Sequence, residues 1–336
     1  MNKIILTLLI LCFLARDAHT QEPYFSQVYS LSQFLSPASV GDGLFQNRIQ
    51  SNIRTQNLLG NSLAKTVFVG WDTYLDNIIE GSYNYIGIGA NVISEQIMGG
   101  AMQVNHLSLN ISSHIFLDEE LNKNLSIGLG GTFSQATLQF DKLNFNDQFS
   151  EGELIYNSQS ISLLYLNKQA NNFLTNTGIK YTHRTESKIL EIGGSAFFYI
   201  KPELSKMISN NDPPKLKTYF FSNYEKEFLD KKSLALHSSY NTRNNFSQIL
   251  IGGFVGLPFG SYYLNSNRLY LGCFYRLNNA IIPSVSILLN HYKLGLSYDV
   301  NNSEFSKAQI RPSAFEVALL TIIGKKLKKN FRTIFD

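Results

Sequence analysis

Apolar and polar residues alternate with a period of two along most of this chain. In the segment 106–117, Leu107, Leu109 and Ile111 alternate with polar residues such as Ser108 and Asn110. Successive side chains of a β-strand point to opposite faces, so this period predicts strands with one apolar and one polar face. The pattern is clearest in the segments 66–75, 85–92, 106–117, 125–134, 269–277, 292–300 and 315–319.

Composition favours a transmembrane β-barrel over a soluble β-sandwich. Charged residues make up 16% of the chain, against roughly 25% in soluble domains, and aromatic residues make up 13%. The polar faces carry Gly, Ser, Asn and single charges, which suit a lumen. Tyr292 and Tyr298 lie near strand ends on an apolar face, as in interfacial aromatic girdles. We therefore predict an all-β transmembrane antiparallel barrel, with the sandwich as the alternative.

The number of strands follows from counting these segments. Weaker alternation adds the candidates 48–56, 156–165, 173–182, 189–199, 217–222, 233–240, 246–255 and 281–289. That makes fifteen, with 48–56 and 217–222 the weakest. Bacterial barrels have an even number of strands and both termini in the periplasm, so we expect about fourteen.

The polar segments between the strands predict turns and loops. The short, Asn-rich segments 118–123, 167–172 and 241–245 are typical of periplasmic turns. The longer segments 142–153 and 201–215 are typical of loops on the outside, although the alternation does not assign a side to the second.

The first twenty residues have the pattern of a secretory signal peptide. Lys3 supplies the positive charge, residues 4–14 form an apolar region too short for a membrane helix, and cleavage is expected between Thr20 and Gln21. We predict four regions: a signal peptide at 1–20, an N-terminal segment at 21–47, an outer-membrane barrel at 48–323 and a basic C-terminal tail at 324–336.

The N-terminal segment does not have the pattern of a strand. Pro23 and Pro37 bracket a short amphipathic run, and proline is confined to the edges of sheets and to turns. We expect the segment 21–41 to be a leader on the periplasmic side of the barrel, against its wall or in its lumen.

Isolated charges lie on the predicted polar faces, in equal numbers of each sign. They are Asp72, Lys180, Arg276, Lys293, Asp299 and Glu316. We favour an internal lattice of ion pairs over a selectivity ring for solutes. The tail holds five basic residues within 324–332, which fits either a solvated tail beside anionic head groups or a docking point for a periplasmic partner.

Catalytic and ligand-binding patterns are weak. Ser108, His106 and Asn110 would suit a hydrolase, but alternate residues of one strand stand roughly 7 Å apart, too far for direct hydrogen bonds. His106 and His114 have no carboxylate at metal-ligand spacing. The net charge of +4 is too small to indicate nucleic acid, and the one cysteine beyond the signal, Cys273, cannot form an intramolecular disulfide. We therefore expect no catalysis, cofactor, metal or nucleic-acid partner.

The N-terminal segment and the residues just after it carry a set of spaced motif residues: Pro23, Phe25, Ser26, Gln27, Pro37, Ala38, Gly41, Arg48 and Arg54. They resemble the opening of the PorP/SprF family of the type IX secretion and gliding system of Bacteroidetes. That family typically opens with Gln-Asp-Pro-x-Phe-Ser-Gln-Tyr and Asn-Pro-Ala-x-x-Gly, followed by an Arg and by Arg-Asn-Gln. Glu22, Val28 and Ser36 depart from the pattern. Weaker similarity continues at 125–129, 144–148, 295–299 and 315–316.

This resemblance implies a non-enzymatic outer-membrane barrel that assists the export or surface attachment of a cognate secreted protein. The implied partners are outer-membrane lipid, a secreted surface protein or adhesin with a C-terminal sorting domain, and other type IX secretion components. The alternatives are a small-solute outer-membrane channel and an outer-membrane hydrolase using Ser108 and His106.

Overall fold

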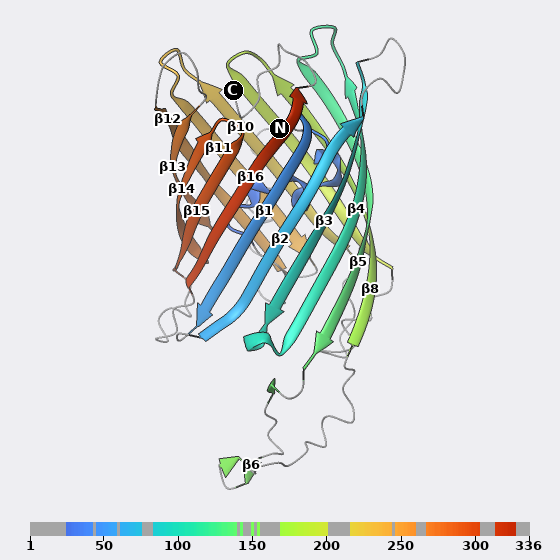
Figure 1. The fold of residues 1–336 in the computed structure, drawn as a ribbon, viewed down its shortest axis with the longest axis vertical. Helices are drawn as coiled ribbons and strands as arrows, with labels where there is room; N and C mark the ends of the chain where they lie inside the picture. Colours follow the sequence, from blue (N-terminus) through green and yellow to red (C-terminus); the bar gives the residue numbers. More distant parts are fainter. Residues whose placement is uncertain are drawn as a thin grey trace, which may run out of the picture.

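The chain folds into a closed barrel of fourteen antiparallel strands, in the order β1-β16-β15-β14-β13-β12-β11-β10-β9-β8-β5-β4-β3-β2 (Figure 1). This computed structural model describes residues 25–42, 45–58, 61–75, 83–139, 142–143, 149–150, 153–154, 169–200, 216–243, 246–259, 267–302 and 313–326. The prediction of an all-β barrel of about fourteen strands is confirmed.

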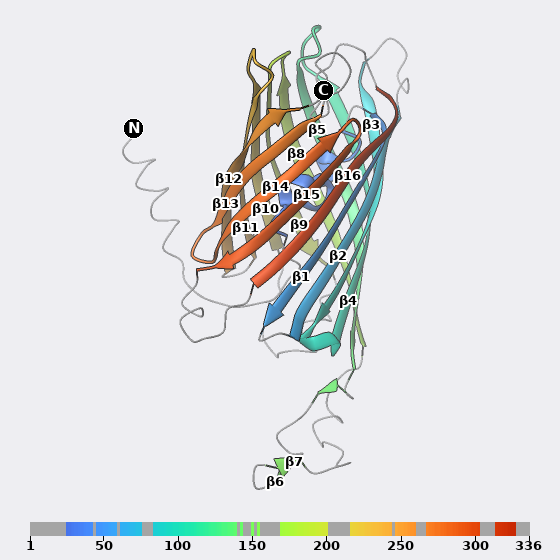
Figure 2. The ribbon, with the colours of Figure 1, turned by 60° about the vertical axis from the view of Figure 1, so that its left-hand side comes forward.

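The barrel strands have the following bounds. The first seven are β1 Phe45–Leu58, β2 Asn61–Leu75, β3 Tyr85–Ile97, β4 Met102–Phe116, β5 Lys123–Leu138, β8 Gln169–Arg184 and β9 Lys188–Tyr199. The other seven are β10 Leu216–Glu227, β11 Ser233–Arg243, β12 Phe246–Pro258, β13 Arg268–Arg276, β14 Ala280–Leu289, β15 Tyr292–Asn301 and β16 Ser313–Lys326. A separate hairpin pairs β6 Phe149–Ser150 with β7 Glu153–Leu154. The barrel closes where β1 pairs with β16, for example at Asn52 opposite Ala318 (Figure 2).

Several predicted segments are placed differently by the structure. The weakest candidates, 48–56 and 217–222, lie within β1 and β10. The segment 167–172 is wrong as a turn, because β8 already begins at Gln169. The candidate strand 156–165 lies outside the described residues.

The barrel has two distinct ends. β1 begins and β16 ends at the same end, which we call the terminal end; it is at the top in Figure 1. The opposite end, which we call the loop end, carries the long connection from β5 to β8 and the connection from β9 to β10. Outer-membrane barrels keep both termini and their short turns in the periplasm and their long loops outside. We therefore assign the terminal end to the periplasm.

This assignment corrects one predicted turn. The connection between β4 and β5, within 117–122, lies at the terminal end. The connection at 244–245 joins β11 to β12 at the loop end, so the predicted periplasmic turn at 241–245 is on the wrong side. The predicted outside loops 142–153 and 201–215 both belong to connections at the loop end.

Apolar side chains point outward and polar side chains point inward. In β15, Leu296 and Tyr298 are 37% and 46% exposed, whereas Ser297 and Asp299 are buried. A soluble protein would show the reverse, so the outward surface is the lipid-facing one. No helix among the described residues is long and apolar enough to cross a membrane.

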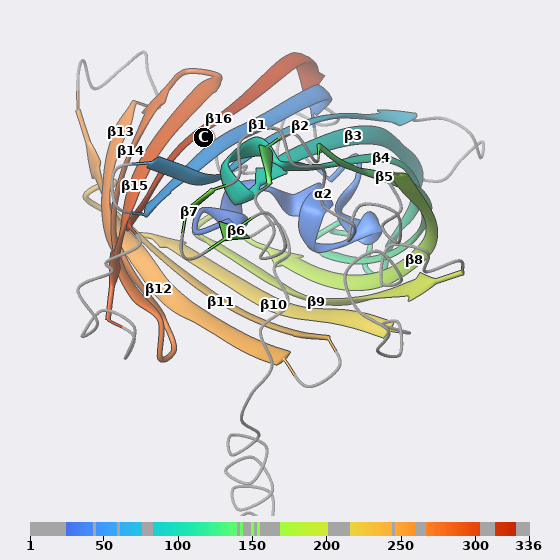
Figure 3. The same ribbon diagram turned by 90° about the horizontal axis from the view of Figure 1, so that it is seen from below.

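Residues 25–42 fill part of the lumen, and we call this segment the plug. It contains the 3-10 helix η2 Val28–Ser30, the short helix α2 Ser32–Leu35 and the 3-10 helix η3 Pro37–Ser39. Seen along the barrel, α2 lies inside the ring of strands (Figure 3). Leu31 and Ala38 are fully buried, so the plug packs tightly against the wall.

The plug runs along the lumen rather than beside its periplasmic mouth. Ser26 contacts Arg276 and Asp299, which lie near the loop-end limits of β13 and β15. Gly41, at the other limit of the plug, approaches Thr73 and Gly87 near the terminal end. The expectation that this segment lies in the lumen is confirmed. Its first described residues, however, begin in the loop-end half, away from the end that we assign to the periplasm.

Candidate functional site: the filled lumen

The first group of buried charges lies in the loop-end half of the lumen. Arg54 of β1 contacts Glu316 of β16 at 2.6 Å and Asp299 of β15 at 3.0 Å. Arg276 of β13 contacts the same Asp299 oxygen at 2.8 Å. None of these side chains is more than 7% exposed, and two cations balance two anions. We call this group the loop-end cluster.

The loop-end cluster binds the start of the plug. The backbone N–H groups of Ser26 and Gln27 donate to the two oxygens of Glu316, the second at 2.9 Å. The Ser26 hydroxyl donates to Asp299 at 2.6 Å and accepts from Arg54 at 2.8 Å. The Glu316 carboxylate thus accepts hydrogen bonds from two backbone N–H groups and from Arg54. Such charge-assisted hydrogen bonds are strong, so they hold the start of the plug against β16.

A second charge group binds the plug between Gln33 and Gly41. Two guanidinium nitrogens of Arg48 lie 2.9 and 3.1 Å from Asp72 Oδ2. Asp72 also accepts from the Gln33 amide at 2.7 Å and from Gly41 N–H at 3.2 Å, and Arg48 donates to Ser39 O at 2.7 Å. One ion pair therefore binds three separate positions of the plug.

A third charge group binds the last described plug residue. Asp42 forms an ion pair with Lys180 of β8, and Arg184 lies 3.5 Å from Asp42. Glu191 of β9 lies 3.8 Å from Lys180 and 3.6 Å from Arg184. Burial by itself raises the pKa of the Asp42 carboxyl, but Lys180 and Arg184 outweigh burial and hold that pKa below its usual value. Here too, two cations balance two anions.

His114 of β4 anchors the plug without an ion pair. Its Nε2 lies 2.7 Å from Val40 O, and Ser112 Oγ donates to the same oxygen at 2.6 Å. The His114 Nδ1 lies 2.8 Å from Ser126 Oγ. His114 is fully buried, and its two ring nitrogens contact the plug and β5.

Glycine residues in the lumen wall leave room for the plug to lie directly against it. A Cβ atom at Gly128 of β5 would lie 2.3 Å from Ala38 N, and one at Gly178 of β8 would lie 2.2 Å from Ser36 Oγ. Real Cβ atoms essentially never approach this closely, so any other residue at Gly128 would displace the plug backbone, and one at Gly178 would displace the Ser36 hydroxyl. The Ser36 hydroxyl also accepts from Ala38 N–H at 3.2 Å and caps η3.

Five of the six predicted lumen charges lie in these three groups, and the sixth lies elsewhere. Asp72, Lys180, Arg276, Asp299 and Glu316 form the ion pairs described above. Lys293 instead lies 4.4 Å from the ring centroid of Tyr270. Arg48 and Arg54, singled out by the resemblance, pair with three of the predicted carboxylates.

Sequence reasoning missed the residues that complete these groups. Asp42 and Gln33 belong to the plug, where no strand pattern could assign an inward direction to a side chain. Arg184 and Glu191 lie at adjoining ends of β8 and β9, where isolated charges on predicted strands could have been noted.

The contacts of Ser108 and His106 do not support the hydrolase alternative, which their spacing on one strand already disfavoured. Ser108 Oγ lies 2.9 Å from Thr132 Oγ1, whereas His106 Nδ1 lies 2.5 Å from Ser134 Oγ. Both partners belong to β5, so Ser108 and His106 bind different residues of the neighbouring strand. Among the described residues, no group of three or more His, Cys, Asp or Glu side chains could hold a metal ion.

A barrel with an apolar outer surface and a charge-paired plug belongs to the class of integral outer-membrane barrel proteins. Residues 18–319 match the family described as "Type IX secretion system membrane protein PorP/SprF". The chain therefore belongs to the PorP/SprF family, as its N-terminal motifs indicated, and it is an outer-membrane protein.

Among similar solved structures, a channel with a TM-score above 0.5 shares the barrel fold. The CymD monoaromatic hydrocarbon channel is 11% identical with a TM-score of 0.52, covering 88% of this chain and 94% of its own. The toluene transporter TbuX of Ralstonia pickettii is 8% identical with a TM-score of 0.49, covering 88% and 94%. At these identities, the likeness shows the fold alone. A search of curated proteins found no match.

Proposed function

We propose that this protein is a non-enzymatic outer-membrane barrel of the type IX secretion system that assists export or surface attachment of a cognate secreted protein. The observation that carries the proposal is the plug. Three charge-balanced groups tie residues 26–42 to six strands, β1, β2, β8, β13, β15 and β16.

The plug argues against free diffusion of solutes through the lumen. Removing one partner of a buried ion pair destabilises a protein by about 3–5 kcal/mol, because the remaining charge is left uncompensated. Withdrawing the plug would separate Asp42 from Lys180 and Gly41 from Asp72 together. A barrel closed in this way acts through its rims and loops, and the longest connections lie at the loop end.

A partner at the loop end would meet the protein on the assigned external side. We infer that a secreted protein with a C-terminal sorting domain binds there, alongside other components of the secretion system. Family membership supports this role.

The test is a deletion strain complemented with wild-type protein or with a variant lacking residues 22–37. We expect wild type to restore the amount of one large secreted protein in the surface and medium fractions, measured by quantitative mass spectrometry. The deletion variant should fail to restore it, while a heat-modifiable gel shift shows whether its barrel is folded.

Conductance separates this function from that of a solute channel. Wild-type protein in a planar bilayer should show no stable openings of porin size. Stable openings together with an unchanged secreted fraction in the deletion strain would replace the proposed function with that of a channel.

A further inference from the structure

Two lysines face each other on the lipid-facing side of the barrel, at the terminal end. Lys188 is the first residue of β9, Lys226 is the last but one of β10, and the two lie directly opposite each other in the register. Both point outward: Ile189, the residue after Lys188, is buried, whereas Phe220, on the same face of β10 as Lys226, is 56% exposed. Opposite residues have Cβ atoms about 5 Å apart, and like charges placed there destabilise a sheet. This position therefore favours an anion between the two lysines.

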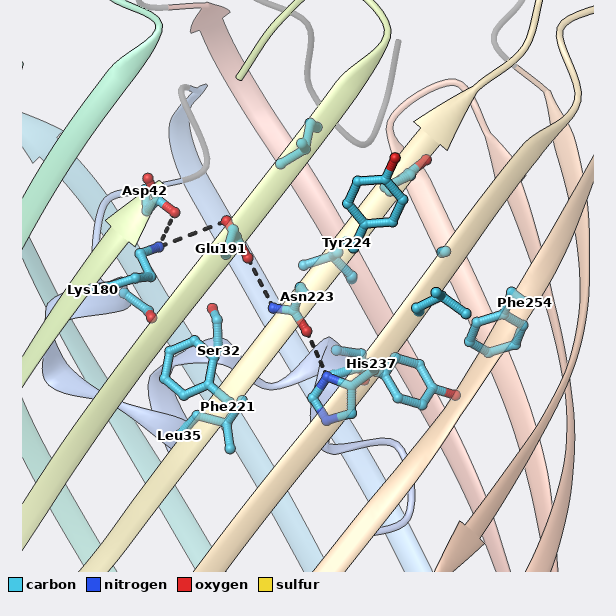
Figure 4. A pocket seen from close by; sticks show the side chains of 18 of the residues that line it. Ser32, Leu35, Asp42, Lys180, Glu191, Phe221, Asn223, Tyr224, His237 and Phe254 are labelled. Atoms are coloured by element: carbon cyan, nitrogen blue, oxygen red, sulfur yellow. Dashed lines mark hydrogen bonds and ion pairs between the residues drawn. The ribbon is translucent and has the colours of Figure 1, made fainter. Parts of the chain in front are cut away.

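The carboxylates on β9 and β10 themselves face the other way. Glu191 points into the lumen, where it lies 3.8 Å from Lys180 and accepts from the Asn223 amide at 2.9 Å (Figure 4). Glu225 lines the cavity between the plug and the lumen wall. Neither carboxylate is on the outward face that carries the lysine pair.

The carboxylates of the adjoining connections do not neutralise the pair either. Those between β10 and β11 already have cations of their own: Glu227 pairs with Arg268 and Lys231, and Asp230 pairs with Lys232. Glu186, in the turn before β9, forms no ion pair with a described residue, and the same holds for Lys188 and Lys226. An anion from outside the described residues therefore fits the lysine pair.

Apolar side chains adjoin the lysine pair on the lipid-facing surface. Leu190 and Ile192 are the next outward residues of β9 toward the middle of the membrane, and Ile192 is 51% exposed. Leu234 of β11 lies opposite Lys226. The Lys226 Nζ lies 4.9 Å from the ring centroid of Phe228, which is 44% exposed. Lysines in such a place keep their stems on apolar surface and extend their amines to the headgroups.

The class of anion follows from this position. The terminal end is assigned to the periplasm, so the lysine pair lies beside the inner leaflet of the outer membrane. A phosphate diester there has two charged oxygens, which can accept from both ammonium groups. A headgroup with a net negative charge is favoured, because the cation of a zwitterionic headgroup would be repelled by the same lysines.

We propose that Lys188 and Lys226 together bind the phosphate of one anionic phospholipid, whose acyl chain lies along Leu190 and Ile192. The site is on the outer wall, away from the loop-end rim on which the proposed secretion function depends, so either can fail without the other.

Native mass spectrometry of the full-length protein in detergent micelles tests the site. Titration with phosphatidylglycerol gives the apparent dissociation constant of the first bound lipid. We expect Lys188→Gln and Lys226→Gln each to weaken this binding about fivefold, the factor for roughly 1 kcal/mol per lysine. Binding of phosphatidylcholine, which has no net charge, should not change.

The matched control is Lys123→Gln. Lys123 is also exposed at the terminal end, on β5, but it lies opposite His183 and not opposite a second lysine. The control should therefore leave the first dissociation constant for phosphatidylglycerol unchanged.

A double-mutant cycle tests whether the two lysines share one phosphate. Urea unfolding of wild type, the two single variants and the double variant gives the coupling free energy between the lysines. The coupling should be repulsive in vesicles of phosphatidylcholine and favourable in vesicles that also contain phosphatidylglycerol. Inorganic phosphate added to phosphatidylcholine vesicles should not reproduce this change of sign, because it has no acyl chain to lie along Leu190.

Three results would overturn the proposal. Equal weakening of phosphatidylglycerol binding by Lys123→Gln would show that any lysine at this end attracts anionic lipid. Repulsion that persists in phosphatidylglycerol vesicles would show that the pair shares no headgroup and would leave it to a soluble anionic partner. A change of sign with inorganic phosphate alone would make the site one for a free anion.

Discussion

Glu316 joins the N-terminal segment to the last strand of the barrel. Its fully buried carboxylate accepts two backbone N–H groups from the plug and pairs with Arg54. The sequence could predict the inward direction of Glu316, because it alternates with the apolar Phe315 and Val317. It could not predict the partner, because Ser26 lies 290 residues away.

Neutralising Glu316 should loosen the plug. In Glu316→Gln, Arg54 loses its closest anion and the N–H groups of Ser26 and Gln27 both lose a charged acceptor, so we expect a loss of about 3–5 kcal/mol, as for a broken buried pair. Urea unfolding followed by tryptophan fluorescence measures the change. The control is Glu119→Gln in the exposed turn after β4, which should stay within about 0.5 kcal/mol. Equal stability of the two variants would contradict a structural role for Glu316.

Asp42 should make the stability of the protein depend on pH only in acidic solution. Its pKa is lowered in the folded state, so its contribution to stability is complete above the ordinary pKa of about 3.9 and is lost as the pH falls through the lower folded value. We expect Asp42→Asn to be less stable than wild type by a constant amount between pH 5 and pH 8, with the difference shrinking below about pH 4. A difference that already vanishes at pH 6 would contradict the low folded pKa. Urea unfolding at each pH provides the measurement.

At the scale of elements, strands and plug differ in how far sequence predicts them. The period of two located the strands because it persists over ten residues or more, as in β4 and β5. The helices of the plug are only three or four residues long, too short for a helical period. Proline indicated that this segment is not a strand, but its path through the lumen depends on distant side chains.

A side chain at Gly128 should displace the plug. In Gly128→Leu, Cβ would collide with the backbone of Pro37 and Ala38, and neither backbone can rotate away as a side chain could. We expect a folded barrel with measurable conductance in planar bilayers. The matched control is Gly131→Leu on the same strand, where the nearest atom to Cβ is a Phe173 ring atom at an ordinary 3.4 Å. If both variants are folded and neither shows conductance, the result would contradict the close packing of the plug against β5.

At the scale of the whole molecule, the even number of strands places both barrel termini at one end. Counting gave fifteen candidate strands, and the general rule that bacterial barrels have an even number led to fourteen. The short, Asn-rich composition of 241–245 assigned that turn to the wrong side. Short turns occur at both ends here, as at 277–279 at the loop end and at 290–291 at the terminal end, so length and composition do not distinguish the sides. Only the order in which all the strands are connected assigns each turn to one end of the barrel.

The assignment of the terminal end to the periplasm predicts which residues can be labelled from outside the cell. Met98 is 52% exposed in the β3–β4 connection at the loop end, and Glu119 is exposed in the β4–β5 connection at the terminal end. Single cysteines would be placed at these positions in a Cys273→Ser background, because Cys273 is an exposed free thiol. Treatment of intact cells with a membrane-impermeant maleimide should label Met98→Cys and spare Glu119→Cys, whereas both should react after cell lysis. The reverse pattern in intact cells would show that the terminal end faces outside. The start of the plug and the proposed partner surface would then lie on the periplasmic side.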